Sequence, residues 1–350
     1  MIDLNSGFSC PLPITDYKNV LLAHGGGGKL SHQLIKNMFA SQFKNELLEP
    51  LHDGAVFSLG GTKFAFSTDS YVINPIFFPG GDIGKLAVNG TVNDLSMCGA
   101  HPLYLSAAFI IEEGLPMDDL WRVVCSMETA AKAAGVQLIT GDTKVVDRGK
   151  GDKIFINTSG IGIIPDGIEI SPRHAKNGDR IILSGTIADH GIAIMSVRAG
   201  LEFETLIESD CAPLNGLVET MLNASKDIHV LRDPTRGGVA TVLNEIAESA
   251  NIGITISEDC IPVSEEVRGA CEILGFDPLY VANEGKLLAF VSPTTAGTVL
   301  AAMQSHPIGK NAVIIGEVVA DHSGMVIMKT HVGGTRVVDM LSGEQLPRIC

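Results

Sequence analysis

The sequence KFAFSTDSYVINPIFFPGGDIGKLAVNGTVNDLSM occupies residues 63–97 and contains both kinds of regular structure that we expect along the chain. Lys63–Ser67 is a short apolar run that predicts a strand, and Ile83–Met97 has the length and apolar content of a helix. Asp69 comes just after the strand, and Asn93 and Asp94 lie on the helix. The stretch therefore indicates mixed α/β structure with acidic residues beside its elements.

Similar elements are predicted on both sides of this stretch. In the first half they are the strand Ile154–Ile164 and the helix Pro116–Ala134, which Gly135 ends. The second half predicts strands at Arg180–Gly185, Ile252–Ser257, Lys286–Val291 and Val313–Val319, and helices at Cys211–Asn223, Arg236–Ala250, Ser264–Leu274 and from Ser292-Pro293 onward. Strands and helices do not alternate strictly, so a doubly wound parallel sheet is not required.

The length of 350 residues favours two domains. We expect an N-terminal extension at residues 1–20 and a first domain at 21–165. The polar segment Pro165–Asp179 has the composition of a linker or an edge hairpin. A second domain is expected at 175–320, and glycine-rich residues 321–350 predict a hairpin followed by an arm.

Charge and composition exclude several classes of protein. The formal net charge is −15 and no run of lysine or arginine exists, which argues against nucleic-acid binding. Acidic residues that bind an anionic ligand need a divalent cation between them, although acidity can also serve solubility alone. Neither a stretch of 18 apolar residues nor a signal peptide is found, so we expect a cytoplasmic protein without membrane contact. Seven cysteines without a CxxC motif argue against a disulfide framework or a zinc ribbon.

Acidic residues placed just after apolar strands form the first candidate site. They are Asp53, Asp69, Asp142 and Asp233, with Asp94 added from the predicted helix. Strand ends on one side of a sheet can bring such carboxylates together, and Mg²⁺ typically links one or two carboxylates to nucleotide phosphates. Each Asp by itself could equally be a turn former or a helix cap. As a set they predict a metal–nucleotide site.

A glycine-rich loop at His24–Lys29, HGGGGK, is the second candidate. Glycines allow backbone amides to approach a phosphate, and Lys29 can add positive charge. The motif is not a Walker A loop, because it lacks the required glycine spacing and the following hydroxyl residue. A flexible surface loop is the alternative interpretation.

Three further motifs could supply reactive groups. Glu284, in NEGK before an apolar strand, could be a general base or part of an exposed turn, and His190 in DHG could cap a helix or touch a substrate. Cys350 is the last residue of the sequence, so its thiol could be delivered into a pocket, and Arg348 would modestly favour the thiolate. The alternative is that the cysteine is an accidental end.

Several motifs together resemble the HypE family of hydrogenase maturation proteins. They include HGGGGK at residues 24–29, residues 67–100, TGDTKVV at 140–146, LRDPTRGG at 231–238, NEGKL at 283–287 and PRIC at 347–350. The resemblance extends from about residue 21 to residue 350. It implies a PurM-like fold of the aminoimidazole ribonucleotide synthetase superfamily. The first domain would bind ATP and form a dimer-spanning barrel, the second would be an α/β domain, and a flexible tail would follow.

The resemblance also implies an activity. Cys350 would be S-carbamoylated by the carbamoyltransferase HypF, and the chain, a homodimer, would then use ATP to dehydrate the carbamoyl group to a thiocyanate. The cyanide would pass to iron on a HypC–HypD complex, as a ligand of the [NiFe] hydrogenase centre. Phosphoryl transfer to the carboxamide oxygen would make it a leaving group, and this step needs positioning and charge neutralisation more than covalent help.

Residue roles are assigned on the same basis. The catalytic residues would be Cys350, with Glu284 as the base and His190 as the second choice. The nucleotide would contact Gly26, Gly27, Lys29, Asp69, Asn93, Asp94, Asp142, Lys144 and Asp233. Mg²⁺ would be held from among Asp53, Asp69, Asp94, Asp142 and Asp233.

Two other functions remain open at this point. A small-molecule kinase or a selenophosphate synthetase of the same superfamily would keep its activity after loss of residues 348–350. A non-catalytic scaffold whose tail docks a partner would not hydrolyse ATP. The carboxylates beside the strands argue against the scaffold, and the PRIC ending argues against the kinase.

Overall fold

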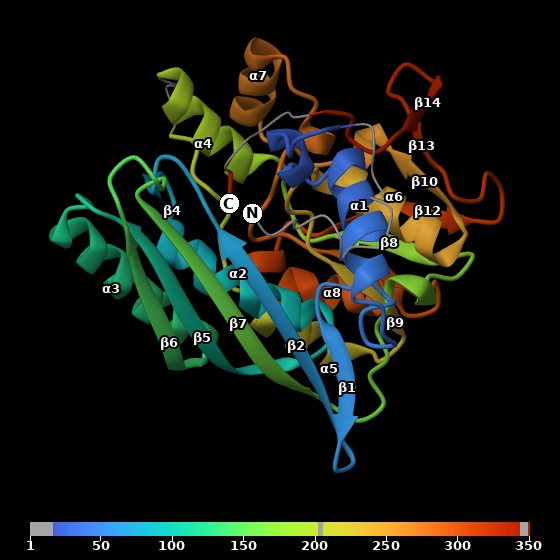
Figure 1. Cartoon of the computed structure of the whole chain (residues 1–350). Coiled ribbons are helices and arrows are strands. Elements are labelled where there is room, and N and C mark those ends of the chain that lie inside the picture. The colour runs from blue at the N-terminus through green and yellow to red at the C-terminus, as the bar shows by residue number, and fades with distance from the viewer. Residues whose placement is uncertain (1–16, 202–205, 344–348) are drawn as a thin grey trace.

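The structure is a computed structural model that describes residues 17–201, 206–343 and 349–350. Two β-sheets, one from each half of the described chain, carry the helices between and around them (Figure 1). The mixed α/β class expected from the sequence is confirmed. Most of the predicted N-terminal extension, and Arg348, lie outside the described residues.

The N-terminal sheet has five strands in the order β1-β2-β7-β5-β6. They are β1 Ala55–Leu59, β2 Thr62–Tyr71, β7 Ile154–Ile164, β5 His101–Glu112 and β6 Gln137–Val146. All neighbours are antiparallel except β5 and β6. Helices α2 (Ile83–Met97) and α3 (Met117–Ala134) lie behind this sheet in Figure 1, and no helix of the described residues covers its front face.

Helix α2 is buried on nearly all sides. Such burial is typical of a helix that packs against several other elements. It contacts β2 and β7 on one side and α3 and α5 (Asn215–Ala224) on others. Asp82 begins the helix by accepting hydrogen bonds from the amides of Gly84 and Lys85. The helix thereby holds Asn93 and Asp94 at the junction of the two domains.

The C-terminal sheet has seven strands in the order β14-β13-β10-β12-β8-β11-β9. They are β8 Arg180–Leu183, β9 Ile228–Arg232, β10 Gly253–Ser257, β11 Leu288–Val291, β12 Val313–Val319, β13 Val326–Lys329 and β14 Thr335–Val338. Around them pack α4 Asp189–Ala199, α6 Gly238–Ala250, α7 Glu265–Leu274 and α8 Ala296–Ser305. The short elements are α1 Lys29–Leu34, β3 Phe77–Phe78 and β4 Gly81–Asp82.

Many predicted elements are confirmed. The helix 83–97 and the strands 154–164 and 313–319 have the predicted bounds, and Gly135, at φ 71°, ends α3. Ser264 caps α7 by accepting a hydrogen bond from the amide of Val267. The predicted hairpin after residue 321 is the antiparallel pair β13–β14.

Two predicted helix starts are wrong. Helix α8 begins at Ala296, because residues 292–295 form a turn. In this turn the carbonyl of Ser292 accepts hydrogen bonds from the amides of Thr295 and Ala296. Helix α5 begins at Asn215 and not at Cys211. The segment before it is tied sideways to α2, since Asn93 receives the amide of Leu214.

Two of the predicted acidic residues lie inside strands. Asp69 is within β2 and Asp142 is within β6, whereas the sequence places both just after a strand. Among the described residues, no helix has the length and hydropathy that a membrane span requires.

Candidate active site

A cavity of about 590 Å³ is lined by side chains from both domains. Its size lies in the range of small-molecule sites. Of the residues predicted from the sequence, the lining includes Gly27, Asp53, Asp69, Asp94, Asp233, Glu284 and Cys350. Segments far apart in the sequence are thus brought to one place.

Three carboxylates in the cavity form a compact cluster. Asp53 precedes β1, Asp94 lies on α2 and Asp233 follows β9, and one oxygen atom of each lies within 4.8 Å of the others. Burial raises the pKa of both Asp94 and Asp233, and the neighbouring carboxylates raise it further. One oxygen of Asp53 is buried without a hydrogen-bond partner among the described residues. Hard oxygen donors that repel one another in this way fit a divalent cation.

Glu284 lies at the wall of the cavity with its backbone fixed from two sides. Its amide donates to Asp210 at 3.0 Å, and its carbonyl accepts from Asn93 at 3.3 Å. The side chain is only 4% exposed, and its Oε1 has no partner among the described residues. Burial, and then the charges of Asp233, Asp210 and Asp69, raise the pKa of Glu284 well above its usual value. Once deprotonated, such a carboxylate is a stronger base than an exposed one.

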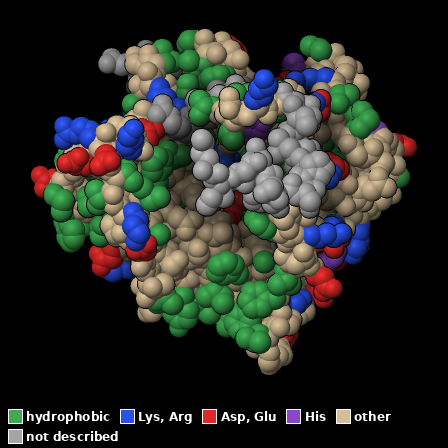
Figure 2. All heavy atoms as spheres, viewed as in Figure 1, with side chains coloured by type: hydrophobic (Ala, Val, Ile, Leu, Met, Phe, Trp, Pro, Cys, Tyr) green, Lys and Arg blue, Asp and Glu red, His purple; other side chains and the backbone are tan. Residues whose placement is uncertain are grey.

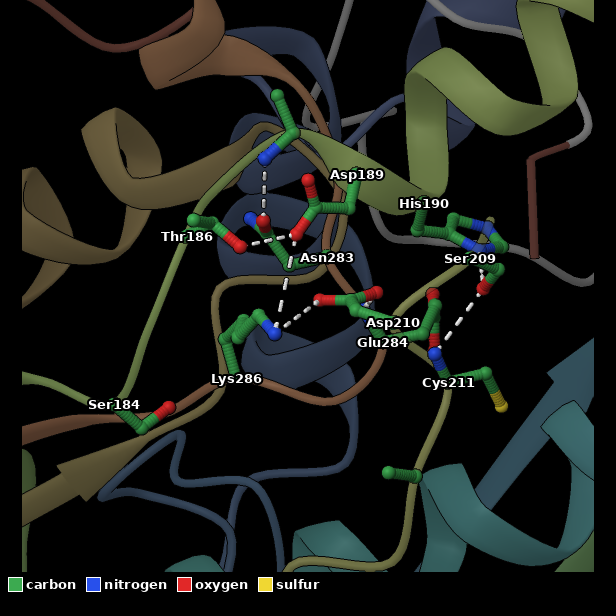
Figure 3. A network of polar contacts seen from close by, with 12 residues as sticks. Ser184, Thr186, Asp189, His190, Ser209, Asp210, Cys211, Asn283, Glu284 and Lys286 are labelled. Atoms are coloured by element: carbon green, nitrogen blue, oxygen red, sulfur yellow. Dashed lines mark hydrogen bonds and ion pairs between the residues drawn. The ribbon is translucent and has the colours of Figure 1, made fainter. Parts of the chain in front are cut away.

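Figure 3 shows the polar network beside Glu284. The ammonium of Lys286 lies 3.9 Å from a carboxylate oxygen of Asp189 and from one of Asp210. Burial is the largest cause that raises the pKa of both carboxyl groups, and the charge of Lys286 opposes it. Because Asp210 also receives the Glu284 amide, this network supports the loop that carries Glu284.

Cys350 lies in the same cavity. Its carbonyl accepts a hydrogen bond from the amide of Val72 at 2.9 Å, just beyond the end of β2. Burial raises the pKa of the Cys350 thiol well above its usual value, while nearby Arg236 lowers it and the carboxylate of Glu284 raises it. In this position the sulfur is therefore a neutral thiol, in the same cavity as the general-base candidate and the acidic cluster.

Comparison with protein families supports one assignment. Residues 51–164 match the N-terminal domain of AIR synthase related proteins, and residues 176–329 match the C-terminal domain. The carbamoyl dehydratase HypE of Azotobacter vinelandii is 54% identical over 332 residues, which span 95% of this chain and 97% of that protein. HypE of Escherichia coli K12 is 48% identical over 95% of this chain and 99% of that one.

The chain belongs to the HypE family of carbamoyl dehydratases.

Solved structures of the HypE family have the same fold. A HypE crystallised with HypF is 52% identical, with a TM-score of 0.84 over 88% of this chain and 99% of that one. A HypE in complex with ATP is 52% identical, with a TM-score of 0.80 over 95% of this chain and 100% of that one. Thiamine monophosphate kinase of Aquifex aeolicus, 17% identical with a TM-score of 0.64, shares the fold alone.

His190 does not line this cavity. One ring nitrogen faces the carbonyl of Ile349 at 2.8 Å and the other faces the hydroxyl of Ser209 at 2.8 Å. Burial lowers the pKa of His190 to about 4, so the ring is neutral near pH 7. Both ring nitrogens are engaged, one of them with the backbone of the tail, and the role of His190 as the second-choice base stays a prediction.

The glycine-rich loop lies at the edge of the cavity. Gly27, at φ +76°, packs so closely on the backbone of Arg236 that a Cβ would lie 2.5 Å from that carbonyl oxygen. The amide of Gly27 donates to Ser31, and that of Gly26 approaches the carbonyl of Ala23. The loop thus approaches the site as expected, with these two amides engaged inside the chain.

Four other predicted contacts lie elsewhere in this structure. Lys29 forms an ion pair of 2.7 Å with Asp339 beyond β14. Asp142 and Lys144 are exposed on β6, where they pair with each other at 2.7 Å, and they do not line the cavity. The side-chain amide of Asn93 makes three hydrogen bonds to the backbone of the C-terminal domain. Lys29 and Asn93 are engaged by nearby partners, whereas Asp142 and Lys144 lie on the edge strand β6, which two strands separate from β2 beside the cavity.

The structure also brings in two arginines that were not selected from the sequence. Arg232 bridges Asp53 at 2.9 Å and Glu245 at 2.7 Å, so it offsets part of the negative charge of the cluster. Arg236 lies beside Cys350. The pKa of Arg236 is raised, and the nearby Cys350 is the largest cause. Both belong to the motif LRDPTRGG, so their proximity to Asp233 was the signal available in the sequence.

Proposed function

We propose that this chain catalyses the ATP-dependent dehydration of an S-carbamoyl group on Cys350 to a thiocyanate. The thiocyanate would supply the cyanide ligand for the iron of [NiFe] hydrogenase. One observation carries the proposal: Cys350, Glu284 and the acidic cluster line a single cavity. A group attached to the sulfur would therefore meet a base and a phosphate-binding centre together.

The chemistry needs three changes at the carbamoyl group. Its oxygen attacks the γ-phosphorus of ATP and ADP leaves, which converts the oxygen into a phosphate ester. One N–H proton is removed, and loss of phosphate with the second N–H proton forms the C≡N bond. Glu284 is the proposed base for the nitrogen, because it is buried at the cavity wall with a free oxygen and a raised pKa. Arg236 would balance the negative charge that develops beside the sulfur.

ATP and Mg²⁺ are proposed as cosubstrate and metal. The HypE in complex with ATP supports the nucleotide, and the buried carboxylates of Asp53, Asp94 and Asp233 fit the cation. Asp69, which also lines the cavity, remains a proposed ligand. When bound, Mg²⁺ would neutralise phosphate charge and orient the γ-phosphate.

The partner proteins are proposed from the same reasoning. The HypE–HypF crystal structure supports HypF as the carbamoyl donor protein, and a HypC–HypD complex is the proposed acceptor of the cyanide. We also propose a homodimer in the cytoplasm. The uncovered face and edge of the N-terminal sheet carry exposed apolar side chains, which include Phe66, Tyr104, Ile110, Leu138, Ile139 and Val145.

Figure 2 shows apolar side chains gathered at the lower end of this sheet, beside a hollow in the same face. A second copy packed there would bury them, as the implied barrel requires. Asp142 and Lys144 do not line the cavity of their own chain, so the proposed nucleotide contacts of these residues would have to reach the partner's site.

The test is the time course of the intact mass of the protein during incubation with HypF, carbamoyl phosphate and ATP–Mg²⁺. We expect a gain of one carbamoyl group followed by loss of one water. Cys350→Ala should abolish both changes, whereas Cys260→Ala, which alters an exposed cysteine elsewhere, should leave them intact. ATP turnover without any modification of Cys350 would instead favour a small-molecule kinase.

A further inference from the structure

The last two residues of the sequence are held between the two domains. Ile349 forms an antiparallel bridge with Ile73, and the carbonyl of Cys350 accepts from the amide of Val72 at 2.9 Å. On the opposite side, the His190 ring at the start of α4 contacts the carbonyl of Ile349 at 2.8 Å. In Figure 1 the end marked C accordingly lies next to α4.

The Ile349 side chain provides the apolar part of this contact. It is 2% exposed and belongs to the hydrophobic core that both domains share. Phe78 packs edge-on against the His190 ring, with 5.6 Å between the ring centroids. An isoleucine buried to this extent contributes more to docking than a partly exposed residue can.

The hydrogen bonds around His190 determine which nitrogen carries the proton. The amide of Cys211 donates to the Ser209 hydroxyl oxygen at 3.1 Å, so this hydroxyl can donate its own hydrogen to Nδ1 of His190. The neutral ring then carries its proton on Nε2, which donates to the Ile349 carbonyl. Figure 3 shows Ser209 between His190 and Cys211. The donor that meets the tail is thus oriented before the tail arrives.

Among the described residues, the hydrogen bonds to Ile349 and Cys350 involve their backbone atoms, and none involves the Cys350 sulfur. We propose that Val72–Ile73, His190 and Ser209 form a binding site that recognises the main chain and the isoleucine side chain of the Ile349–Cys350 dipeptide. Recognition is independent of the group on the sulfur. Because the contacts are made to the dipeptide itself, the site also accepts it from a separate molecule.

This independence has a chemical use within the proposed function, on which it partly rests. One site can hold the tail as thiol, thiocarbamate or thiocyanate, with Cys350 at the wall of the cavity. Recognition would then not have to change as the reaction proceeds. His190 and Ser209 are positioning residues in this scheme, since they act through the tail backbone.

Peptide binding tests the site without relying on catalysis. The protein is the full chain with Ile349→Gly and Cys350→Ala, so that its own tail competes weakly. The probe is a peptide with the sequence of residues 346–350, whose binding is followed by NMR shifts of the protein. We expect roughly millimolar affinity for a dipeptide anchor. Replacing the peptide isoleucine by glycine should weaken binding by about tenfold or more, and replacing its cysteine by alanine should change it by less than about threefold.

Three results would overturn the proposal: no binding of the parent peptide, equal binding of the glycine peptide, or a loss on Cys→Ala as large as that on Ile→Gly. The S-carbamoyl peptide with ATP–Mg²⁺ provides the second readout. We expect its dehydration in trans, with a KM raised about tenfold by His190→Leu at unchanged kcat and restored by His190→Gln, which keeps a donor. Peptides that bind with the expected isoleucine dependence but are not dehydrated would support the binding site and count against the proposed function.

Discussion

The side chain amide of Asn93 donates to the backbone carbonyl of Glu284 at 3.3 Å across the boundary between the domains. The same amide nitrogen donates to Ala212 at 3.1 Å, and its oxygen accepts from Leu214 at 2.8 Å. One buried residue of α2 thus holds two loops of the C-terminal domain. Asn93 thereby positions Glu284, and the nucleotide contact expected from the sequence stays a prediction.

Replacement of Asn93 by alanine should destabilise the fold while sparing nucleotide affinity. Loss of three buried hydrogen bonds should lower the free energy of unfolding by about 3 kcal/mol. Urea unfolding and ATP titration measure the two effects, and the exposed Asn223→Ala on α5 is the control, expected to change stability by less than about 0.5 kcal/mol. An unchanged stability with an ATP affinity lowered more than about tenfold would restore the direct-contact role.

Glu284→Gln should separate chemistry from binding. The amide keeps the shape of the side chain but cannot accept a proton, so dehydration of carbamoylated Cys350 should slow by about 10²–10⁴-fold. ATP affinity should change by no more than about threefold, since the residue is proposed to act on the tail. Single-turnover mass spectrometry measures the rate, and Glu219→Gln, at an exposed position of α5, is the matched control. A normal rate in Glu284→Gln would assign the base elsewhere.

Asp233→Asn should stabilise the metal-free protein and remove its response to Mg²⁺. The three clustered carboxylates repel one another, and the amide relieves part of that repulsion. We expect the melting temperature without metal to rise by roughly 1–3 °C. Addition of Mg²⁺ should raise the melting temperature of the wild type but not of the variant. Equal Mg²⁺ stabilisation of both proteins would place the cation away from the cluster.

His190 should make stability depend on pH in a specific direction. Its pKa in the folded state is lowered to about 4, chiefly by burial and further by the charge of Arg198. The unfolded chain therefore takes up the proton first as pH falls. The contribution of neutral His190 to stability is complete above about pH 6.5 and is lost as pH falls toward 4.

Between about pH 7 and pH 5 this loss amounts to about 2 kcal/mol. His190→Gln cannot titrate, so its stability should fall by correspondingly less over the same range in urea unfolding. The carboxyl groups with raised pKa titrate in both proteins, so their contribution to the pH dependence of stability cancels in the comparison. Parallel pH profiles for wild type and variant would show that His190 is not buried as the structure has it.

The proposed dimer can be tested on the uncovered sheet face. Ile139 on β6 is 61% exposed, and Ile273 on α7, away from this sheet, is 68% exposed. Ile139→Asp should give a monomer in light scattering, because a charge buried in an apolar interface is costly. Ile273→Asp should leave the dimer intact. A dimer in both variants would locate the interface elsewhere.

Much of the fold could be predicted because its strongest elements carry local signals. The apolar content of residues 83–97 and of 154–164 sufficed for their bounds, and Ser264 and Gly135 marked helix ends by local capping chemistry. The starts of α5 and α8 could not be predicted in this way. The amide of Leu214 is fixed by Asn93, which is distant in the sequence, and the turn at Ser292 begins with an amide that donates to Asp227.

The candidate site shows the same division. Acidic residues beside the elements were a sufficient signal for Asp53, Asp94 and Asp233, which the fold brings together. The sequence could not show that Lys29 is engaged by Asp339 or that the His190 ring faces a backbone carbonyl. These roles depend on partners that only the tertiary structure brings within a few ångströms.

The docked position of Ile349 and Cys350 has a consequence for affinity. If Cys350 is the substrate, as we propose, it belongs to its own enzyme and is present at an effective concentration of roughly millimolar order, as for a covalently linked ligand. Under the proposed function, an intrinsically weak site would then be occupied for much of the time and would still release the tail to the proposed partner proteins. Tighter binding of the tail would slow its dissociation and would add little to its occupancy of the site. We therefore expect selection to favour a small contact.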